Sequence, residues 1–96
     1  MNNHILIVED EEDLLNTLEY NFKKEGYKVT GVTSGKRAIE EALSKSKPDL
    51  LILDLMLPDI SGLEVCKQIR NYPTNKDILI LMLTAKGEEV DRIVGF

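Results

Sequence analysis

Residues 50–62, LLILDLMLPDISG, decide the predicted fold because they join a buried strand that ends in Asp54 to a loop that contains Pro58 and Gly62. The first four residues are continuously apolar, which is typical of a strand covered on both faces of a parallel sheet. Similar runs cover residues 5–8 and 78–83, and a weaker run of mixed polarity, with a glycine, covers residues 28–32. The sequence therefore predicts four parallel strands, with residues 28–32 at an edge of the sheet.

Amphipathic stretches between these runs predict helices. Gly26 follows the first stretch as a stop signal, Ser34 can cap the second, and Ser61 and Glu64 have the spacing of a capping box for the third. The inner face of this third helix is expected to be Leu63, Cys66 and Ile69. A fourth helix is predicted over residues 88–96. Strands and helices then alternate, which indicates an α/β fold with helices on both faces of the sheet.

The bulk composition limits the kinds of protein to consider. The 96 residues suit a single domain, residues 1–96, and 43% hydrophobic with 30% charged residues is ordinary for a folded chain. The formal net charge of −5 disfavours direct binding of nucleic acid. Cys66 is the only cysteine, and no apolar run approaches membrane-spanning length. We therefore expect a cytoplasmic protein that is neither secreted nor embedded in a membrane.

Acidic residues follow two of the predicted strands. Glu9 and Asp10 come directly after the first strand, and Asp54 ends the third. If these strands are neighbours, the three carboxylates converge, and two unit charges 4 Å apart repel by about 4 kcal/mol at an effective dielectric of about 20. Oxygen ligands of this kind favour Mg²⁺. A loop so acidic would repel a bare phosphate, so it does not suit FMN or a dinucleotide, and a metal must bind first.

Two alternative interpretations concern the acidic residues. Glu11, Glu12 and Asp13 are better explained as an acidic helix start. A small Mg²⁺-dependent phosphatase is also disfavoured. Haloacid-dehalogenase-like enzymes require a second acid two residues after the nucleophilic aspartate, and this chain has Met56 two residues after Asp54. The sequence shows no other pairing of a nucleophile with a base, since His4 is the only histidine and lies near the N-terminus.

Three segments together resemble a known family: residues 5–11 (ILIVEDE), 53–62 (LDLMLPDISG) and 83–85 (LTA). They are similar to response-regulator receiver domains of two-component signalling, and their sequences are most similar to those of the OmpR-like branch. The resemblance implies a flavodoxin-like (CheY-like) doubly wound parallel sheet with strand order 2-1-3-4. The family pattern continues past Phe96 with a fifth strand, a fifth helix and a lysine. The resemblance therefore implies a receiver domain that is C-terminally incomplete.

The resemblance also implies roles for individual residues. Asp54 would accept a phosphoryl group from a sensor histidine kinase, and the hydroxyl of Thr84 and the backbone amide of Ala85 would bind phosphoryl oxygens. The expected ligands of Mg²⁺ are Glu9, Asp10, Asp54 and the backbone carbonyl of Met56. The chain would not be an enzyme beyond phosphorylating itself from small phosphodonors and dephosphorylating itself. Its output domain would lie outside this chain, and the absent lysine would slow phosphoryl transfer by about 10²–10³.

The incomplete pattern leads to two further expectations. Residues 78–83 would form an edge strand, and such an edge invites pairing with another chain, so we expect self-association or exchange of elements. The competing function is a truncated receiver-fold fragment that serves only as an interaction scaffold, without phosphoryl transfer. The sequence does not name the cognate kinase, the output domain or the regulated genes.

Overall fold

The structure, a computed structural model, describes residues 3–83 and 93–95. Within these ranges the strands are β1 (His4–Val8), β2 (Lys28–Val32), β3 (Leu50–Asp54), β4 (Leu79–Leu83) and β5 (Ile93–Gly95). The helices are α1 (Glu12–Lys24), α2 (Gly35–Ala42), α3 (Gly62–Arg70) and the short 3₁₀ helix η1 (Pro73–Asn75). The predicted alternation of strands and helices is therefore confirmed from β1 to β4.

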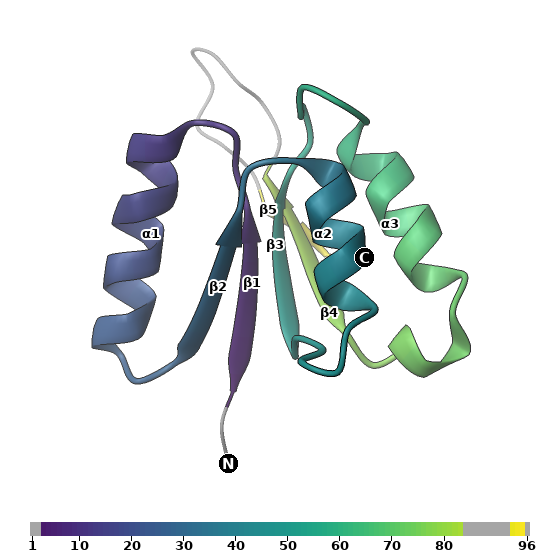
Figure 1. Ribbon diagram of the computed structural model, residues 1–96, viewed down its shortest axis with the longest axis horizontal. Helices are drawn as coiled ribbons and strands as arrows, with labels where there is room; N and C mark the ends of the chain where they lie inside the picture. The colour runs from purple at the N-terminus through teal and green to yellow at the C-terminus, as the bar shows by residue number, and fades with distance from the viewer. Residues whose placement is uncertain (1–2, 84–92, 96) are drawn as a thin grey trace.

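The strands form one sheet in the order β2-β1-β3-β4-β5. Figure 1 shows β2, β1 and β3 side by side. The first four are parallel, and β1 lies between β2 and β3, with Val8 beside Val32 on one side and beside Leu53 on the other. The predicted order 2-1-3-4 is confirmed, and so is the edge position of residues 28–32. The order of the strands reverses between β1 and β3, which is where open α/β sheets place their sites.

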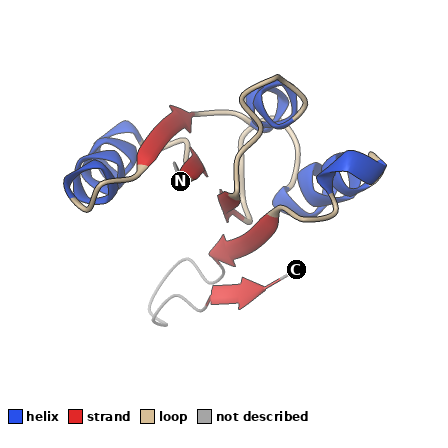
Figure 2. Cartoon of the chain, turned by 90° about the horizontal axis from the view of Figure 1, so that it is seen from below, coloured by secondary structure: helices blue, strands red, loops and turns tan. Residues whose placement is uncertain are grey.

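The helices cover both faces of the sheet. In Figures 1 and 2, α1 packs on one face, and α2 and α3 pack on the other. The core beneath α2 and α3 is built around Leu6, Leu51, Leu53, Val65, Ile69, Ile80 and Met82. The smaller core beneath α1 consists of Ile5, Ile7, Leu15 and Ile52. β1 and β3 contribute to both cores, which explains why their sequences are apolar without alternation.

The ends of the helices largely follow the sequence signals. Ser34 caps α2 by accepting a hydrogen bond from the Arg37 amide, and Gly26 ends α1 with a φ of +99°, a conformation that favours glycine. Ser61 likewise caps α3. The predicted inner face of α3 was wrong at Leu63, which is 50% exposed, whereas Val65 is buried. None of the helices in the described ranges is long and apolar enough to cross a bilayer.

The C-terminal segment differs from the prediction. A helix was expected over residues 88–96, but Ile93–Gly95 form β5, which pairs antiparallel with β4. Residues 88–92 and 96 lie outside the described residues. β5 runs along Leu81–Leu83, so this part of the β4 edge is paired within the chain itself. A free strand edge offers unpaired N–H and C=O groups, and β-branched residues such as Ile93 and Val94 favour strands, so pairing prevails over helix here.

Candidate functional site

The candidate site lies at the carboxyl ends of β1 and β3. Glu9 and Asp10 follow β1 directly, and Asp54 is the last residue of β3. β1 and β3 are paired with Val8 beside Leu53, so the residues that follow each strand end side by side. One carboxylate oxygen from each of the three acids lies within 4.8 Å of the others. The structure thus brings together the three carboxylates that the sequence singled out.

Backbone amides orient two of these carboxylates. Glu9 and Asp54 are each only 4% exposed, whereas Asp10 is exposed. The Glu11 amide donates to Oε2 of Glu9 at 3.1 Å, and the Met56 amide donates to Oδ1 of Asp54 at 3.1 Å. Each buried acid is therefore held by an amide two residues further along the chain, and the exposed Asp10 marks the side of the cluster that solvent reaches.

The charges and donor atoms of this cluster fit a hard divalent cation. Two carboxylates within 4.8 Å of one another repel by about 3 kcal/mol at an effective dielectric of about 20. A doubly charged ion converts this repulsion into attraction. The set offers oxygen atoms from Glu9, Asp10 and Asp54 and contains no thiol or imidazole, so its chemistry suits Mg²⁺ or Ca²⁺ rather than zinc.

The loop after β3 is fixed against the site at both ends. The Leu55 amide donates to the carbonyl of Leu83, and the Gly62 amide donates to the carbonyl of Leu55. At Gly62 a Cβ atom would lie 2.7 Å from the carbonyl oxygen of Asp54 and 3.0 Å from Cα of Leu55. Only glycine allows α3 to begin this close to the backbone of Asp54. Gly62 therefore shapes the site from outside the set of acids.

The other site residues predicted from the sequence are Met56, Thr84 and Ala85. The Met56 side chain is 62% exposed, and its amide binds Asp54 as noted above, while a role for its carbonyl stays a prediction. Thr84 and Ala85 lie outside the described residues. The preceding residue, Leu83, is the register partner of Asp54, so β4 and β3 end at the same level of the sheet.

The sequence analysis missed the role of Asp59. Its Oδ1 accepts a hydrogen bond from the Gly35 amide and its Oδ2 one from the Lys36 amide, both at 2.9 Å, so it caps α2 from the loop after β3. These bonds, the one from Gly35 first, lower the pKa of Asp59 below its ordinary value. The dipeptide Pro58-Asp59 signals a turn with a capping side chain, but nothing in the sequence names a helix more than 20 residues away as the one it caps.

Comparison with known proteins agrees with this fold and this arrangement of acids. Residues 5–96 match the family described as "Response regulator receiver domain". This chain belongs to that family. The receiver domain is 46% identical over 95 residues to the alkaline phosphatase synthesis transcriptional regulatory protein PhoP of Bacillus subtilis. It is 47% identical over 91 residues to the phosphate regulon transcriptional regulatory protein PhoB of Rhizobium meliloti.

Solved structures also resemble the receiver domain. A putative response regulator from Chloroflexus aurantiacus superposes with a TM-score of 0.82 at 39% identity, covering 92% of this chain and 71% of the other. The response regulator TrrA from Thermotoga maritima, solved in complex with Mg²⁺ and BeF, has a TM-score of 0.78 at 38% identity and covers 88% of this chain and 70% of the other. The two curated relatives cover 99% and 95% of the receiver domain, which spans only 38% and 40% of their own lengths.

Proposed function

We propose that Asp54 is the phosphoacceptor of this receiver domain and that its phosphorylation depends on Mg²⁺. The observation that carries this proposal is the meeting of Asp54 with Glu9 and Asp10, all within 4.8 Å, at the point where the strand order reverses. A single buried aspartate at a strand end has many explanations. A buried aspartate beside two further acids, one of them open to solvent, has the composition of a metal-assisted phosphoryl-transfer site.

The chemistry that this arrangement supports is a displacement at phosphorus. A carboxylate oxygen of Asp54 forms a bond to the phosphorus atom, and the bond from phosphorus to the donor breaks. When the donor is the phosphohistidine of a sensor kinase, the electron pair of the broken P–N bond stays with the departing imidazole. The Met56 amide holds Oδ1 of Asp54 throughout, which fixes the direction of the carboxylate before the donor arrives.

The proposed ligands of Mg²⁺ are Glu9, Asp10, Asp54 and the backbone carbonyl of Met56. When bound, the ion supplies positive charge that offsets both the repulsion among the carboxylates and the charge of the incoming phosphoryl group. Glu9 is held in place by the Glu11 amide. Asp10 is exposed, so it lies where a hydrated ion first reaches the cluster. The hydroxyl of Thr84 and the amide of Ala85 are the proposed partners of the phosphoryl oxygens.

The proposed cellular role is a phosphorylation-controlled signalling module rather than an enzyme that turns over other substrates. Its donor would be a sensor histidine kinase in the cytoplasm. The named relatives are transcriptional regulatory proteins more than twice the length of this chain, so the proposed output is control of transcription through a further domain. The rival interpretation, a scaffold of receiver fold without phosphoryl transfer, makes a different prediction in the experiment below.

The experiment is labelling by a small phosphodonor. The protein is incubated with acetyl phosphate, with Mg²⁺ or with EDTA, and its intact mass is measured. We expect the mass of one phosphoryl group to be added with Mg²⁺ only, and none to be added to Asp54→Asn. Asp77→Asn is the matched control, because it removes one exposed carboxylate before β4, at the opposite end of the sheet, and should label like the wild type. A wild-type protein that never gains mass would favour the scaffold, and an Asp54→Asn protein that does gain it would overturn Asp54 as the acceptor.

A further inference from the structure

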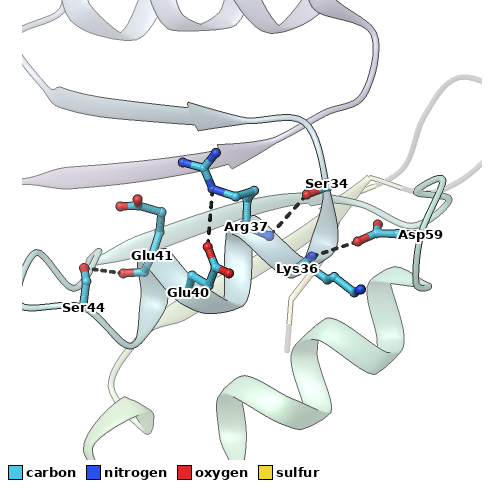
Figure 3. Close-up of polar contacts among 7 residues, drawn as sticks. All are labelled: Ser34, Lys36, Arg37, Glu40, Glu41, Ser44 and Asp59. Atoms are coloured by element: carbon cyan, nitrogen blue, oxygen red, sulfur yellow. Dashed lines mark hydrogen bonds and ion pairs between the residues drawn. The ribbon is translucent and has the colours of Figure 1, made fainter.

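Asp59 joins two parts of the molecule that are distant in sequence. Its two carboxylate oxygens accept from the consecutive amides of Gly35 and Lys36, so they satisfy two of the donors that the start of α2 leaves unpaired. Ser34 satisfies the next donor, the Arg37 amide. Figure 3 shows this division, with Ser34 acting from within the helix start and Asp59 reaching across from the loop after β3.

The packing around this contact is tight. A Cβ atom at Gly35 would lie 2.6 Å from Cγ1 of Ile60 and 2.8 Å from Cγ2 of Val65. The residue after Asp59 is therefore pressed against the same helix start that the Asp59 carboxylate binds. Two adjacent loop residues, one through its charge and one through its shape, fix the loop against α2.

This contact lies only a few residues from the acidic site. Asp59 follows Met56, the residue whose amide holds Oδ1 of Asp54, by three positions, and Pro58 between them restricts the backbone. The backbone hydrogen bonds described above for this loop are at its ends, on Leu55 and Gly62. Asp59 is thus the residue whose side chain fixes the middle of the loop to α2 by hydrogen bonds, beside the packing of Ile60.

The geometry points to Asp59 as a positioning residue for phosphorylation: by capping α2 it holds the loop so that Met56 keeps its amide on Oδ1 of Asp54. This inference rests on the function proposed above. It differs from a purely structural role, because a cap that only stabilised α2 would leave the Met56 amide and the rate of labelling unchanged.

The test compares two caps of the same helix. Asp59→Ala removes the cap that comes from the loop, and Ser34→Ala removes the local cap and leaves the loop untouched. We expect Asp59→Ala to be labelled by acetyl phosphate on the order of tenfold more slowly, since small displacements of positioning groups reduce rates by up to about 10²-fold. Ser34→Ala should label at the wild-type rate despite a similar loss of stability. Asp59→Asn, which keeps one acceptor oxygen, should fall between Asp59→Ala and the wild type.

A second measurement does not depend on labelling. The temperature coefficient of the Met56 amide proton, measured by NMR, reports whether this N–H still donates a hydrogen bond. We expect the bond to be lost in Asp59→Ala and kept in Ser34→Ala. Equal labelling rates in the two variants would overturn the inference, as would an unchanged Met56 amide in Asp59→Ala. If the wild type is not labelled at all, the proposed function fails, and the Met56 amide alone decides whether Asp59 positions the loop.

Discussion

Replacing Asp54 by asparagine should stabilise the metal-free protein, even though it removes the proposed phosphoacceptor. Asp54 is 4% exposed and lies with Glu9 and Asp10 in a cluster whose oxygens are within 4.8 Å of one another. Asparagine has nearly the same shape, and its side-chain oxygen can still accept from the Met56 amide. The substitution therefore changes the charge of the cluster with little change in its packing.

The expected magnitude follows from the distances. Each carboxylate pair at 4.8 Å repels by about 3 kcal/mol at an effective dielectric of about 20. Asp54 takes part in two such pairs, but solvent reaches the cluster through the exposed Asp10, and salt screens charges near the surface. We therefore expect the free energy of unfolding to rise by about 1–3 kcal/mol in Asp54→Asn, below the sum of the two pair energies.

The assay is urea unfolding followed by circular dichroism, with EDTA or with Mg²⁺. Bound Mg²⁺ stabilises only the folded state, so the wild type should gain stability with the ion, and Asp54→Asn should gain less because a neutral amide oxygen replaces a charged carboxylate ligand. Asp77→Asn controls for the change of one unit in net charge. An Asp54→Asn protein no more stable than the wild type in EDTA would refute the expected relief of repulsion, as would equal stabilisation by Asp77→Asn.

Three further predictions concern the surroundings of the site. Gly62→Ala should lose about 1–3 kcal/mol of stability and label poorly, because the new Cβ would meet the backbone of Asp54. Its control, Gly26→Ala, is strained by a φ of +99° and should lose about 1 kcal/mol but label normally. Urea unfolding measures the stabilities, and acetyl phosphate labelling measures the phosphorylation. Since hydrogen bonds lower the pKa of Asp59 in the folded state, its contribution to stability is complete above its unfolded value near 3.8 and is lost as the pH falls through the folded value. Unfolding measured from about pH 5 downward should therefore show a smaller acid-dependent loss in Asp59→Ala than in the wild type, and parallel curves would contradict this. Val94→Pro should break the pairing of β5 with β4 and increase self-association through the exposed edge, seen as a concentration-dependent mass in light scattering; an unchanged monomeric mass would contradict that role of the edge.

The sequence predicted the fold well where a single pattern controlled the structure. The continuous apolar runs of β1 and β3 could only be buried on both faces, and this fixed their central place in the sheet. The same runs placed Glu9, Asp10 and Asp54 at strand ends. Their meeting also required β1 and β3 to be neighbours, which the family resemblance implied and the structure shows. Metal binding and phosphorylation at these residues stay predictions, because a sequence pattern places carboxylates together but does not itself demonstrate ion binding or phosphoryl transfer.

Other features depended on contacts that local patterns do not contain. The helix period alone could not decide between Leu63 and Val65 on α3, because the close approach of Gly62 to the backbone of Asp54 sets how the helix begins. The residues of β5 were read as a helix because the pairing partner that makes them a strand, β4, is supplied only by the folded sheet. The capping of α2 by Asp59 was missed for the same reason.

The most direct measurement locates the phosphoryl group on the chain. After incubation with acetyl phosphate and Mg²⁺, the protein is treated with borohydride, which reduces an acyl phosphate to an alcohol, and its peptides are mapped by mass spectrometry. We expect Asp54 alone to be converted to homoserine, and only when Mg²⁺ was present. Conversion at Glu9 or Asp10 would contradict Asp54 as the acceptor, and conversion at Asp54 in EDTA would contradict the dependence of phosphorylation on Mg²⁺.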